Sequence, residues 1–546
     1  MRRLREKRRF SKPQLTTFFL ILIFCLSITA TGFAGEMITG KDLFKHTTKG
    51  AVYGGVYRSS SNAPRSLDAH QETYGLTTQV TNNTNNTLVR LTQDMTGVEP
   101  DLAKSWRRLD PLTYEFKIHK GVRFQDIPPM NGRELTSTDI KYSIQRVAGK
   151  YGKRANFKHR YYFEGKLASI ETPDRYTVIF KTKEPYAPFI RYIAAPWSTI
   201  VPREAVEKYG DLKRKALGTG PFILKEFVRG SHIIMVKNPN YFKKGLPYLD
   251  KIHYKIMRDP AAILAAFLAG KHNATGFYFF QLPTVKKEAP ECNIFRAKGT
   301  HMWVIRTPPW IKGKKPQQPP FDKRKVRQAI GHAIDKKRLL KLAWGGFGTV
   351  QIGCVPNFPP FSLPPEDQIE YNPEKAKKLL AEAGYPNGFN TEFITWNLSY
   401  VTKPAQVIKE MLAEVGINVN LKTMEMAQYF NKTYRFDYFM SLHIMTAAVD
   451  PEEMFAPYYG QVDKSTFYKW SNEKIWKAIA EQSRELDEKK RIAMIHKIQR
   501  MVNEDAPNLF CYTQYRFWTN RPYVHYKFYH NEYQVRLMEE CWLAKH

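Results

Sequence analysis

Cysteine is scarce in this chain of 546 residues, which contains only five. Small folds held together by disulfides have a much higher proportion of cysteine, so that class is excluded. Long hydrophobic runs are also lacking: the mean hydropathy is −0.49, and only one stretch is continuously apolar. A membrane protein with several spans is therefore excluded as well.

Catalytic and metal-binding motifs are missing too. The sequence contains no Walker phosphate loop, dinucleotide-binding fingerprint or nucleophile elbow. Its 14 histidines form no His-Glu-x-x-His motif, and no Cys-x-x-Cys pair occurs, so a dedicated zinc site lacks support. We interpret the adjacent acids Glu452-Glu453 and Glu539-Glu540 as exposed charge, because neighbouring side chains diverge. The sequence therefore predicts no enzyme activity, no cofactor and no metal.

Acidic residues are few relative to basic ones: 51 Asp and Glu against 85 Lys and Arg, for a net charge of +34. The basic clusters, such as Lys323-Arg324-Lys325 and Lys489-Lys490-Arg491, are dispersed along the chain. Nucleic-acid-binding proteins collect such charge on one face or in one run. We therefore expect a solvated basic surface and no nucleic-acid partner. The alternative is a field that attracts anionic ligands or anionic envelope polymers without a specific site.

The N-terminal segment has the three parts of a secretory signal. Residues 1–12 carry seven Lys or Arg, residues 18–28 are apolar, and small residues Gly32 and Ala34 follow. We predict a signal peptide over residues 1–34. The alternative, an uncleaved anchor, needs about 20 apolar residues, more than this run provides. Cys25 follows Phe24 rather than a small residue, so a lipid-anchored cysteine is not expected.

Export would place the remaining cysteines in a compartment that permits disulfides. Four cysteines allow three pairings, and the sequence alone does not choose among them. We favour a bond between Cys511 and Cys541, because both lie near the C-terminus. Removal of residues 1–34 would leave a net charge of +28, so export does not account for the positive charge.

Hydrophobic periodicity places helices and strands in alternation, which predicts an α/β or α+β fold. Thr136 and Asp139 can form a capping box at the start of one helix. Asn372 and Gly384 bound another, in which Ala376 and Leu380 form part of the apolar stripe. The other expected elements are helices over 326–334 and 407–415, strands over 114–118, 176–180 and 417–421, and a hairpin of 222–224 with 233–236.

A series of short motifs occurs in a fixed order along the chain. They are Leu102–Trp106, Lys120–Phe124, Gly218-Thr219-Gly220-Pro221-Phe222, Asn238–Phe242, Tyr248–Ile252, Val326–Ile330 and Tyr371–Tyr385. In this order and spacing the chain resembles the family 5 extracellular solute-binding proteins of bacterial ABC importers. Members of that family take peptides, nickel chelates, opines and some sugars. The motif residues form capped helices and turns, with Gly218 and Gly220 expected to supply glycine torsions, so they indicate the fold rather than the ligand.

The resemblance implies a periplasmic-binding-protein-like fold, with two hinged α/β lobes and a third domain inserted in the first lobe. Mapped onto this chain, lobe I comprises 35–81, 212–300 and 505–546, the inserted domain is 82–211, and lobe II is 301–504. The function implied is capture of a small peptide or peptide-like solute in the cleft between the lobes. The partner implied is an ABC permease in the inner membrane, with the protein a periplasmic monomer that catalyses no reaction.

The position that binds a peptide's ammonium group departs from the family pattern. In peptide-binding members, a Trp-x-x-Asp string on lobe II supplies the aspartate. Here His443 occupies the tryptophan position, and the aspartate position is Thr446 or Ala447, depending on the alignment. None of these can neutralise a buried ammonium, and an unpaired buried charge is costly. Asp450 supplies the carboxylate only if the loop shifts.

A second departure concerns the strand that crosses between the lobes. Arg306 replaces the family's usual asparagine there, so the pocket gains a cation and loses an acid. We expect neutral or anionic ligands. The full set of candidate ligand residues is Tyr74, Trp303, Arg306, Trp396, Tyr400, Met426, His443, Thr446 and Asp450. The alternatives are a receptor for a metal chelate or an anionic solute, and, in a different class, a secreted hydrolase, for which no motif is found.

Overall fold

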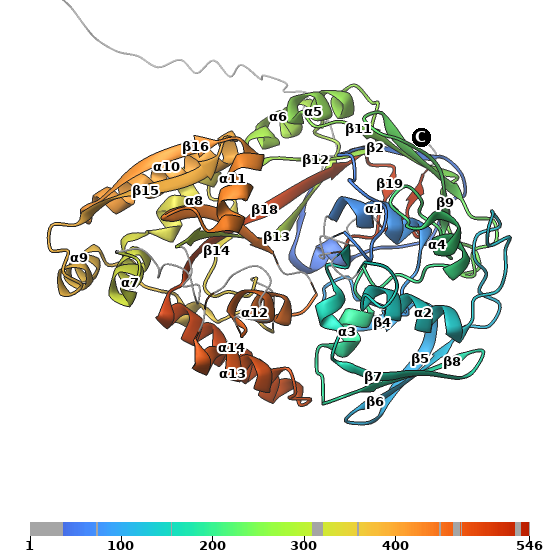
Figure 1. Cartoon of the computed structure of the whole chain (residues 1–546). Coiled ribbons are helices and arrows are strands. Elements are labelled where there is room, and N and C mark those ends of the chain that lie inside the picture. The colour runs from blue at the N-terminus through green and yellow to red at the C-terminus, as the bar shows by residue number, and fades with distance from the viewer. Residues whose placement is uncertain are drawn as a thin grey trace, which may run out of the picture.

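The computed structural model describes residues 36–72, 75–153, 156–307, 320–356, 360–446, 449–461, 470, 472–529 and 537–544. Helices and strands are interleaved along the chain (Figure 1). The strands form three main sheets, which we name the central, flanking and lower sheets. This mixed architecture confirms the predicted α/β class. None of the helices within the described residues is long and apolar enough to cross a membrane.

The central sheet has eight strands in the order β12-β18-β13-β17-β15-β16, with β1 beside β13 and β14 beside β18. Its strands are β1 (Met37–Thr39), β12 (Ala274–Phe277), β13 (Asn293–Arg306), β14 (Gly348–Val350), β15 (Phe389–Trp396), β16 (Ile417–Met424), β17 (Met440–Thr446) and β18 (Asn508–Asn520). Strands β15, β16 and β17 are parallel to one another, whereas β13 is antiparallel to both β17 and β18.

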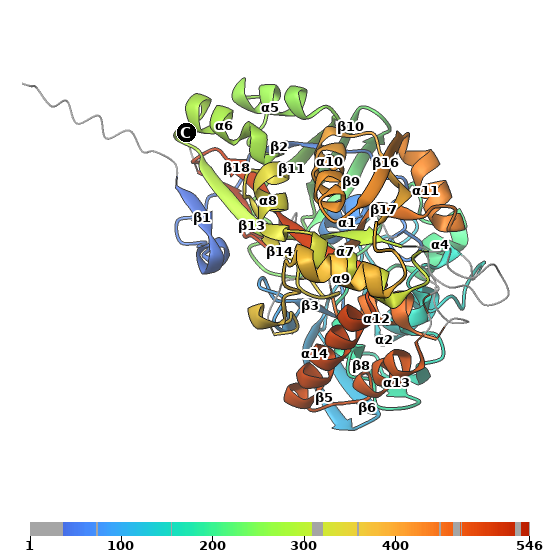
Figure 2. The same ribbon diagram turned by 90° about the vertical axis from the view of Figure 1, so that its left-hand side faces the viewer.

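Two long antiparallel strands, β13 and β18, run side by side through the molecule (Figure 2). The first half of β13 pairs with β1, and its second half pairs with β17. The register between β13 and β18 shifts between Lys298 and Met302. Gly299 lies in this shift, where an added Cβ would be 2.7 Å from the carbonyl oxygen of Gln514. The two strands therefore join one half of the molecule to the other at a place that only glycine fits.

Helices cover both faces of the second half of the central sheet. Side chains alternate along β13, so Trp303 and Ile305 pack with one group of helices and Met302 and Val304 with the other. The first group is α7 (Arg324–Ala333), α8 (Lys336–Trp344), α9 (Pro373–Glu382), α10 (Ser399–Ala413) and α11 (Met426–Arg435). The second group is α12 (Glu452–Tyr459), α13 (Glu473–Gln482) and α14 (Glu488–Asp505).

The expected helix ends are found where the sequence places them. Asn372 accepts a hydrogen bond from the backbone N–H of Lys375 at the start of α9, and Gly384 follows that helix with φ +87°. Thr136 and Asp139 form the predicted capping box of α2 (Ser137–Val147). These local predictions are confirmed because capping depends only on residues close in sequence.

The flanking sheet has the order β2-β11-β10-β9, and the predicted hairpin is formed by β9 and β10. Its strands are β2 (Val56–Ser61), β9 (Phe222–Val228), β10 (His232–Lys237) and β11 (Lys251–Ile256). Three elements pack with it: α1 (Gly75–Thr84), β19 (Val524–His525) and β20 (Trp542–Leu543). Four others pack with strands of the central sheet or with one another: η1 (Gly40–Phe44), α5 (Pro260–Leu268), η4 (Phe279–Gln281) and α6 (Leu282–Glu288).

The lower sheet is antiparallel, in the order β5-β6-β8-β7, and it has a core of its own. Apart from Val449, the buried residues of that core come from the segment 88–217. The elements of this segment are β3 (Val89–Leu91), β4 (Val98–Pro100), β5 (Ala103–Asp110), β6 (Thr113–Ile118), α2, η3 (Arg160–Tyr162), β7 (Leu167–Asp174), β8 (Thr177–Thr182), α3 (Phe189–Ile193) and α4 (Arg203–Tyr209).

The glycines of the Gly218-Thr219-Gly220 motif serve a different purpose from the one predicted. Neither has a positive φ, so the expectation of special torsions is wrong. Instead, the backbone of Thr84 approaches so closely that a Cβ on Gly220 would be 2.4 Å from its carbonyl carbon. Buried Asn85 donates to the carbonyl oxygen of Leu217, 2.7 Å away, in the same contact. Close packing of two backbones therefore requires these glycines.

Replacing Gly220 by alanine is expected to lower the free energy of unfolding by about 1–3 kcal/mol, because the added methyl group must displace packed backbone. Chemical denaturation measures this. Gly97→Ala is the matched control, since its Cβ would meet only the Thr92 side chain at 3.8 Å. A Gly220 variant no less stable than the Gly97 variant would contradict the packing explanation.

All four cysteines of the described residues are free and buried, so the favoured bond between Cys511 and Cys541 is not formed. Cys511 lies near the start of β18 within the core of the central sheet, whereas Cys541 packs in the core of the flanking sheet. Proximity to the same chain end did not bring the two residues together, because β18 crosses the molecule between them.

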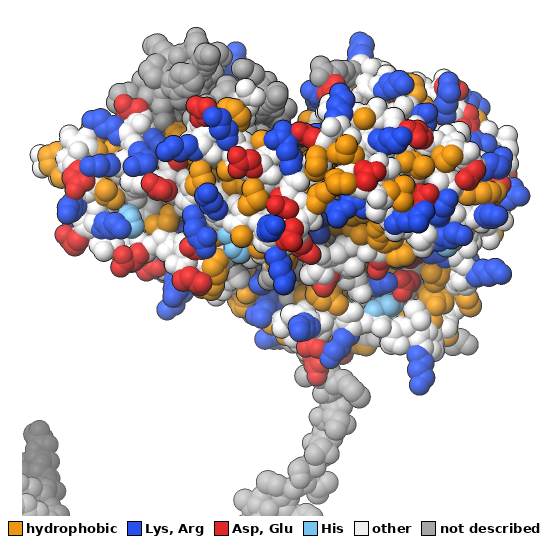
Figure 3. Space-filling view, turned by 90° about the horizontal axis from the view of Figure 1, so that it is seen from below, with side chains coloured by type: hydrophobic (Ala, Val, Ile, Leu, Met, Phe, Trp, Pro, Cys, Tyr) orange, Lys and Arg blue, Asp and Glu red, His pale blue; other side chains and the backbone are white. Residues whose placement is uncertain are grey.

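Several acids expected at the surface are buried. Glu539 is 2% exposed and accepts hydrogen bonds from Arg90 and, at 2.7 Å, from the Tyr241 hydroxyl. Glu452 and Glu453 are each 7% exposed. The expectation of exposed charge is therefore wrong for these three residues. Partners distant in sequence bind Glu539 and Glu452, and the backbone N–H of Val449 donates to Glu453. On the face in Figure 3, by contrast, basic and acidic side chains are interspersed, as expected for a solvated basic surface.

The buried histidine His159 predicts sensitivity to acid. Its ring stacks on Trp197 at 4.2 Å, and burial lowers its pKa to about 4. As the pH is lowered from 7 to 5, the unfolded chain binds a proton at this residue and the folded chain does not. The free energy of unfolding therefore decreases by about 2 kcal/mol over this range. Chemical denaturation at both pH values measures this. Lowering the pH from 7 to 5 should cost the His159→Gln variant about 2 kcal/mol less stability than it costs the parent protein. Equal pH dependence in the two proteins would contradict this assignment.

Candidate functional site

Two of the candidate residues lie at the carboxyl edge of the central sheet. Trp396 and Thr446 are the last residues of the parallel strands β15 and β17, so their positions lie at the carboxyl edge. Thr446 is paired with His301 of β13, next to the register shift at Gly299. This edge therefore faces the junction between the two halves of the molecule. Ligands of open α/β sheets bind outside the carboxyl ends of strands.

An aromatic cluster covers this edge. The Trp303 ring lies parallel to the Trp396 ring, with centroids 5.8 Å apart, and both are buried. Tyr400, at the start of α10, stacks on Tyr278 at 5.5 Å, which connects α10 to the segment after β12. The indole Nε1 of Trp396 is buried and has no hydrogen-bond partner among the described residues. That N–H group is available to an acceptor atom of a ligand.

Arg306 brings a buried positive charge to the other end of β17, near its amino end. It is 4% exposed and lies opposite Ser441 in the pairing of β13 with β17. Burial raises the pKa values of Tyr429 and Tyr438, and the positive charge of Arg306 opposes that rise, so both hydroxyls lie within its field. A guanidinium among phenolic hydroxyls is suited to a carboxylate or another oxyanion.

His443 is neutral in this environment. Burial is the main cause that holds its pKa well below the ordinary value, and the charge of Arg306 adds to the effect. The Tyr429 hydroxyl donates to the carbonyl oxygen of Leu442 at 2.6 Å, so the His443 Nδ1–H donates to the tyrosine oxygen at 2.8 Å. The Nε2 atom of this tautomer carries a lone pair and can accept a hydrogen bond from an N–H group.

The remaining candidates are placed less centrally. Met426 is the first residue of α11 and is 45% exposed, and Thr446 is half-buried. Tyr74 and Ala447 lie outside the described residues. Asp450 is fully buried, and its two oxygens accept hydrogen bonds from Arg491 at 2.6 and 3.0 Å.

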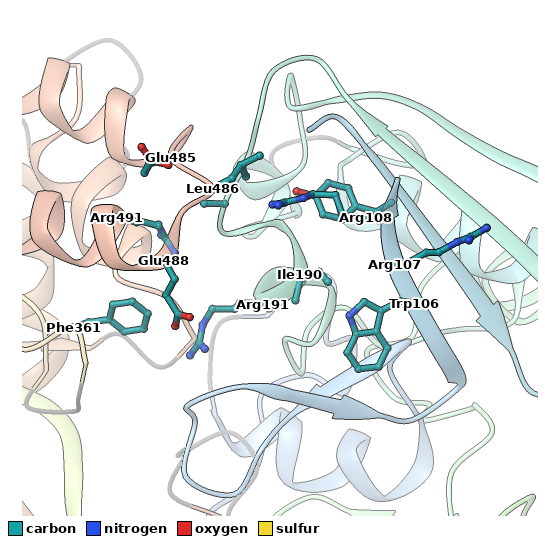
Figure 4. Close-up of a pocket in the computed structure, with 12 residues that line it drawn as sticks. Trp106, Arg107, Arg108, Ile190, Arg191, Phe361, Glu485, Leu486, Glu488 and Arg491 are labelled. Carbon is teal, nitrogen blue, oxygen red and sulfur yellow. The ribbon is translucent and has the colours of Figure 1, made fainter. Parts of the chain in front are cut away.

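Asp450 also contacts the region of the lower sheet. Arg191 of α3 lies 3.7 Å from its carboxylate and donates to the carbonyl oxygen of Val449 at 2.6 Å. We name the group of Asp450, Arg191 and Arg491 the clasp. Its two arginines help to line a pocket of about 470 Å³ between α3, β5 and the start of α14 (Figure 4). The clasp therefore fastens the lower-sheet region to the second group of helices around the central sheet.

Several of these residues are not detectable from sequence motifs. Tyr278, Tyr429, Arg191 and Arg491 come from four separate segments, and none lies in a motif of the resemblance. For Tyr429 the available sequence signal was weak: it lies with Thr433 on the buried face of α11, where a core role is the ordinary expectation. Within the described residues, no cluster of three or more His, Cys, Asp or Glu side chains is arranged to hold a metal ion.

Two α/β halves joined by a pair of crossing strands, with aromatic and charged residues at the junction, define the class of hinged solute-binding proteins. A family model supports this independently: "Bacterial extracellular solute-binding proteins, family 5 Middle" matches residues 97–466, more than half of the chain. The chain belongs to the family 5 bacterial extracellular solute-binding proteins. The predicted family and fold are therefore confirmed.

Individual relatives agree with this assignment. The chain is similar to the glutathione-binding protein GsiB of Salmonella choleraesuis, with 30% identity over 325 residues, 58% of this chain and 59% of the relative. The match thus spans less than two thirds of that relative's length.

Solved structures show the same fold over a larger share of the chain. The Helicobacter pylori periplasmic binding protein DppA, in complex with peptide STSA, has a TM-score of 0.78 at 24% identity and covers 91% of this chain and 100% of its own. AgaA of A. tumefaciens, in complex with agropinic acid, has a TM-score of 0.75 at 25% identity, covering 90% of this chain and 99% of its own.

Proposed function

We propose that this protein is the substrate-binding component of an ABC importer, which captures a small peptide or peptide-like solute between its two halves. The observation that carries the proposal is the set of Trp396, Arg306 and His443, which offers one N–H donor, one cation and one neutral acceptor on the neighbouring strands β15, β13 and β17. Relatives described as binding glutathione and a peptide support it, since both ligands have carboxylates and nitrogen-bound hydrogens.

Each group has a distinct role in this proposal. Arg306 binds a carboxylate of the solute, the Trp396 N–H group donates to another acceptor atom of the solute, and Nε2 of His443 accepts from a solute N–H group. Tyr400 provides aromatic surface for apolar or planar parts of the solute, and buried Trp303 packs behind it. Thr446 contributes only a neutral hydroxyl, so no carboxylate at this position binds a free ammonium group of the solute. Tyr74, Met426 and Asp450 complete the proposed set, with Asp450 acting through the clasp.

In this proposal the two halves hinge about the strands β13 and β18 that join them. A solute that contacts both halves favours the closed arrangement only through contacts it does not make in the open one. Closure excludes water and strengthens the polar contacts inside. The closed form is then the form presented to the permease of the inner membrane. No covalent bond of the solute is made or broken, so the protein is not an enzyme in this proposal.

The setting of the protein belongs to the same proposal. Residues 1–34 act as a signal peptide that is removed on export to the periplasm, and the mature protein acts as a monomer without nucleic acid. The lobes and the inserted domain follow the boundaries given above. The separate core drawn from residues 88–217 supports an inserted domain over about 82–211.

A receptor for an anionic solute without peptide character is the second candidate. The buried charge of Arg306 favours it, because a cation buried in a ligand site selects an anion. The two candidates differ in one test, since only a peptide-like ligand offers an N–H group to His443. A dicarboxylate that binds more tightly than any peptide would support the second candidate.

Native mass spectrometry of the purified protein is expected to reveal a co-purified solute in the peptide mass range. Thermal-shift titrations then use glutathione and dialanine, each compared with its N-acetyl and C-terminal amide forms. Amidation should weaken binding about tenfold or more, because a charged hydrogen bond is lost. N-acetylation should change affinity by less than about threefold. A reversed order, or no binding of any peptide probe, would contradict the proposal.

A further inference from the structure

A second hollow lies away from the proposed solute site, between α5 and the outer surface of the flanking sheet. Figures 1 and 2 both show α5 above β2 and β11. The groove has a volume of about 640 Å³, in the range typical of small-molecule sites. Its lining residues are Arg58, Ser59, His253, Lys255, Met257, Ala262, Ala265, Ala266, Ala269, Lys271 and His272.

One wall of the groove is unusually apolar for a surface helix. Residues 260–270, which include α5, carry no charged side chain. Leu264 and Phe267 point into the core, as expected for an amphipathic helix. The opposite face, which ordinarily carries polar residues, presents exposed Ala262 and Ala265 instead. Small side chains along this face leave room between the helix and the sheet.

The rim of the groove is basic. Arg58 and Lys255 come from β2 and β11, and Lys271 follows α5, so the positive charges lie on both sides. None of the three forms an ion pair with another described residue, and no acid is among the described residues that line the groove. The groove therefore combines an apolar wall with uncompensated positive charge.

His272 gives an independent sign that the groove is built for a ligand. Its side chain lines the groove and is 5% exposed, yet its Nδ1 atom has no hydrogen-bond partner among the described residues. Buried polar atoms in folded proteins are normally satisfied. Burial lowers the pKa of His272, and nearby His253 lowers it further, which keeps the ring neutral and able to donate or accept.

We propose that this groove binds a single-chain anionic amphiphile, with its alkyl chain against the alanine face of α5 and its carboxylate or phosphate head at the basic rim. The apolar wall suits a flexible chain, because it has no aromatic pockets of the kind that anchor protein partners. The rim suits one negative head group, which Lys255 and Lys271 approach from opposite sides. The site is separate from Arg306 and His443 and does not depend on the importer role.

The test is calorimetric titration of the purified protein with decanoate, below the concentration at which it forms micelles. We expect saturable binding at one site. Octanoate should bind about tenfold more weakly, since two methylene groups are lost, and butanoate should not bind measurably. Decyl glucoside, which has the same chain and no charge, should bind more weakly than decanoate.

Two matched variants locate the site. Ala265→Glu places a carboxylate in the groove and should weaken decanoate binding about tenfold or more, whereas Ala261→Glu, on the same helix but outside the groove, should leave it unchanged. Both positions are exposed, so both variants are expected to fold, which their melting temperatures verify. The double variant Lys255→Gln, Lys271→Gln should lose the preference for decanoate over decyl glucoside.

Three outcomes would overturn the proposal. The first is absence of decanoate binding, and the second is equal binding by Ala265→Glu and Ala261→Glu. The third is a protein that binds no free decanoate but adsorbs to anionic vesicles or self-associates, with the Ala265→Glu substitution abolishing that adsorption or self-association. In that case the groove would be a docking surface for a membrane or for a second copy of the chain.

Discussion

Replacing Asp450 by asparagine is expected to lower the free energy of unfolding by about 3–5 kcal/mol, because the change leaves two buried arginines without their shared acid. Asp450 is 0% exposed, and Arg491 binds both of its oxygens. Arg191 is 8% exposed and approaches the same carboxylate from α3. An asparagine of the same shape retains the packing but removes the charge and one of the two acceptor oxygens, so the loss measures the clasp as a whole.

Chemical denaturation, followed by circular dichroism, measures the effect. Glu207→Gln is the matched control, because its partner Arg203 forms an ion pair with it at 2.6 Å in which both side chains are largely exposed. Exposed pairs of this kind contribute about 0–1 kcal/mol. A loss of stability in the Asp450 variant no greater than in the control would show that the clasp does not hold the two regions together.

The clasp also predicts a direction for pH dependence. The charges of Arg491 and Arg191 hold the pKa of Asp450 below its ordinary value, against the opposing effect of burial. A carboxyl group with a lowered pKa in the folded state stabilises the protein above its unfolded pKa, and that contribution is lost as the pH falls through the folded value. In Asp450→Asn, stability should therefore decline less steeply with acid below about pH 4 than in the parent protein.

Local features of this fold were predictable because their causes are local. Asn372 caps α9 and Gly384 ends it, and both act within one or two turns of the helix. The glycines of the Gly218-Thr219-Gly220 motif were recognised as constrained, but the wrong cause was inferred. The true cause is the backbone at Thr84, which is more than 130 residues away in the chain. Periodicity and capping patterns contain no information about such an approach.

The clasp shows the same limit at the level of the site. Asp450 was a candidate from its sequence context, but its partners Arg191 and Arg491 appear in the sequence only as two among 85 basic residues. Likewise, Arg306 and His443 were singled out as departures from a family pattern, whereas Tyr429, which fixes the tautomer of His443, was not. A sequence pattern can identify a candidate site residue such as His443. Its protonation state depends on the side chains packed around it, which the pattern does not contain.

Replacing Arg306 by glutamine is expected to weaken binding of the best ligand found in the peptide screen by about 30- to 1,000-fold, since loss of a buried charged partner costs about 2–4 kcal/mol. Isothermal titration measures the change. Arg435→Gln is the control, because Arg435 is exposed at the end of α11 and should leave the affinity within about twofold.

A second measurement separates a direct role of Arg306 from a general loss of structure. Its charge is one of the two causes that lower the pKa of His443, the other being burial. In a folded Arg306→Gln variant the pKa of His443 should therefore rise while staying below its ordinary value, because burial persists. NMR titration of the imidazole nitrogens measures this shift. If the His443 pKa rises and ligand affinity is unchanged, Arg306 lies beside the histidine without contacting the solute, and the carboxylate of the ligand is bound by other donors.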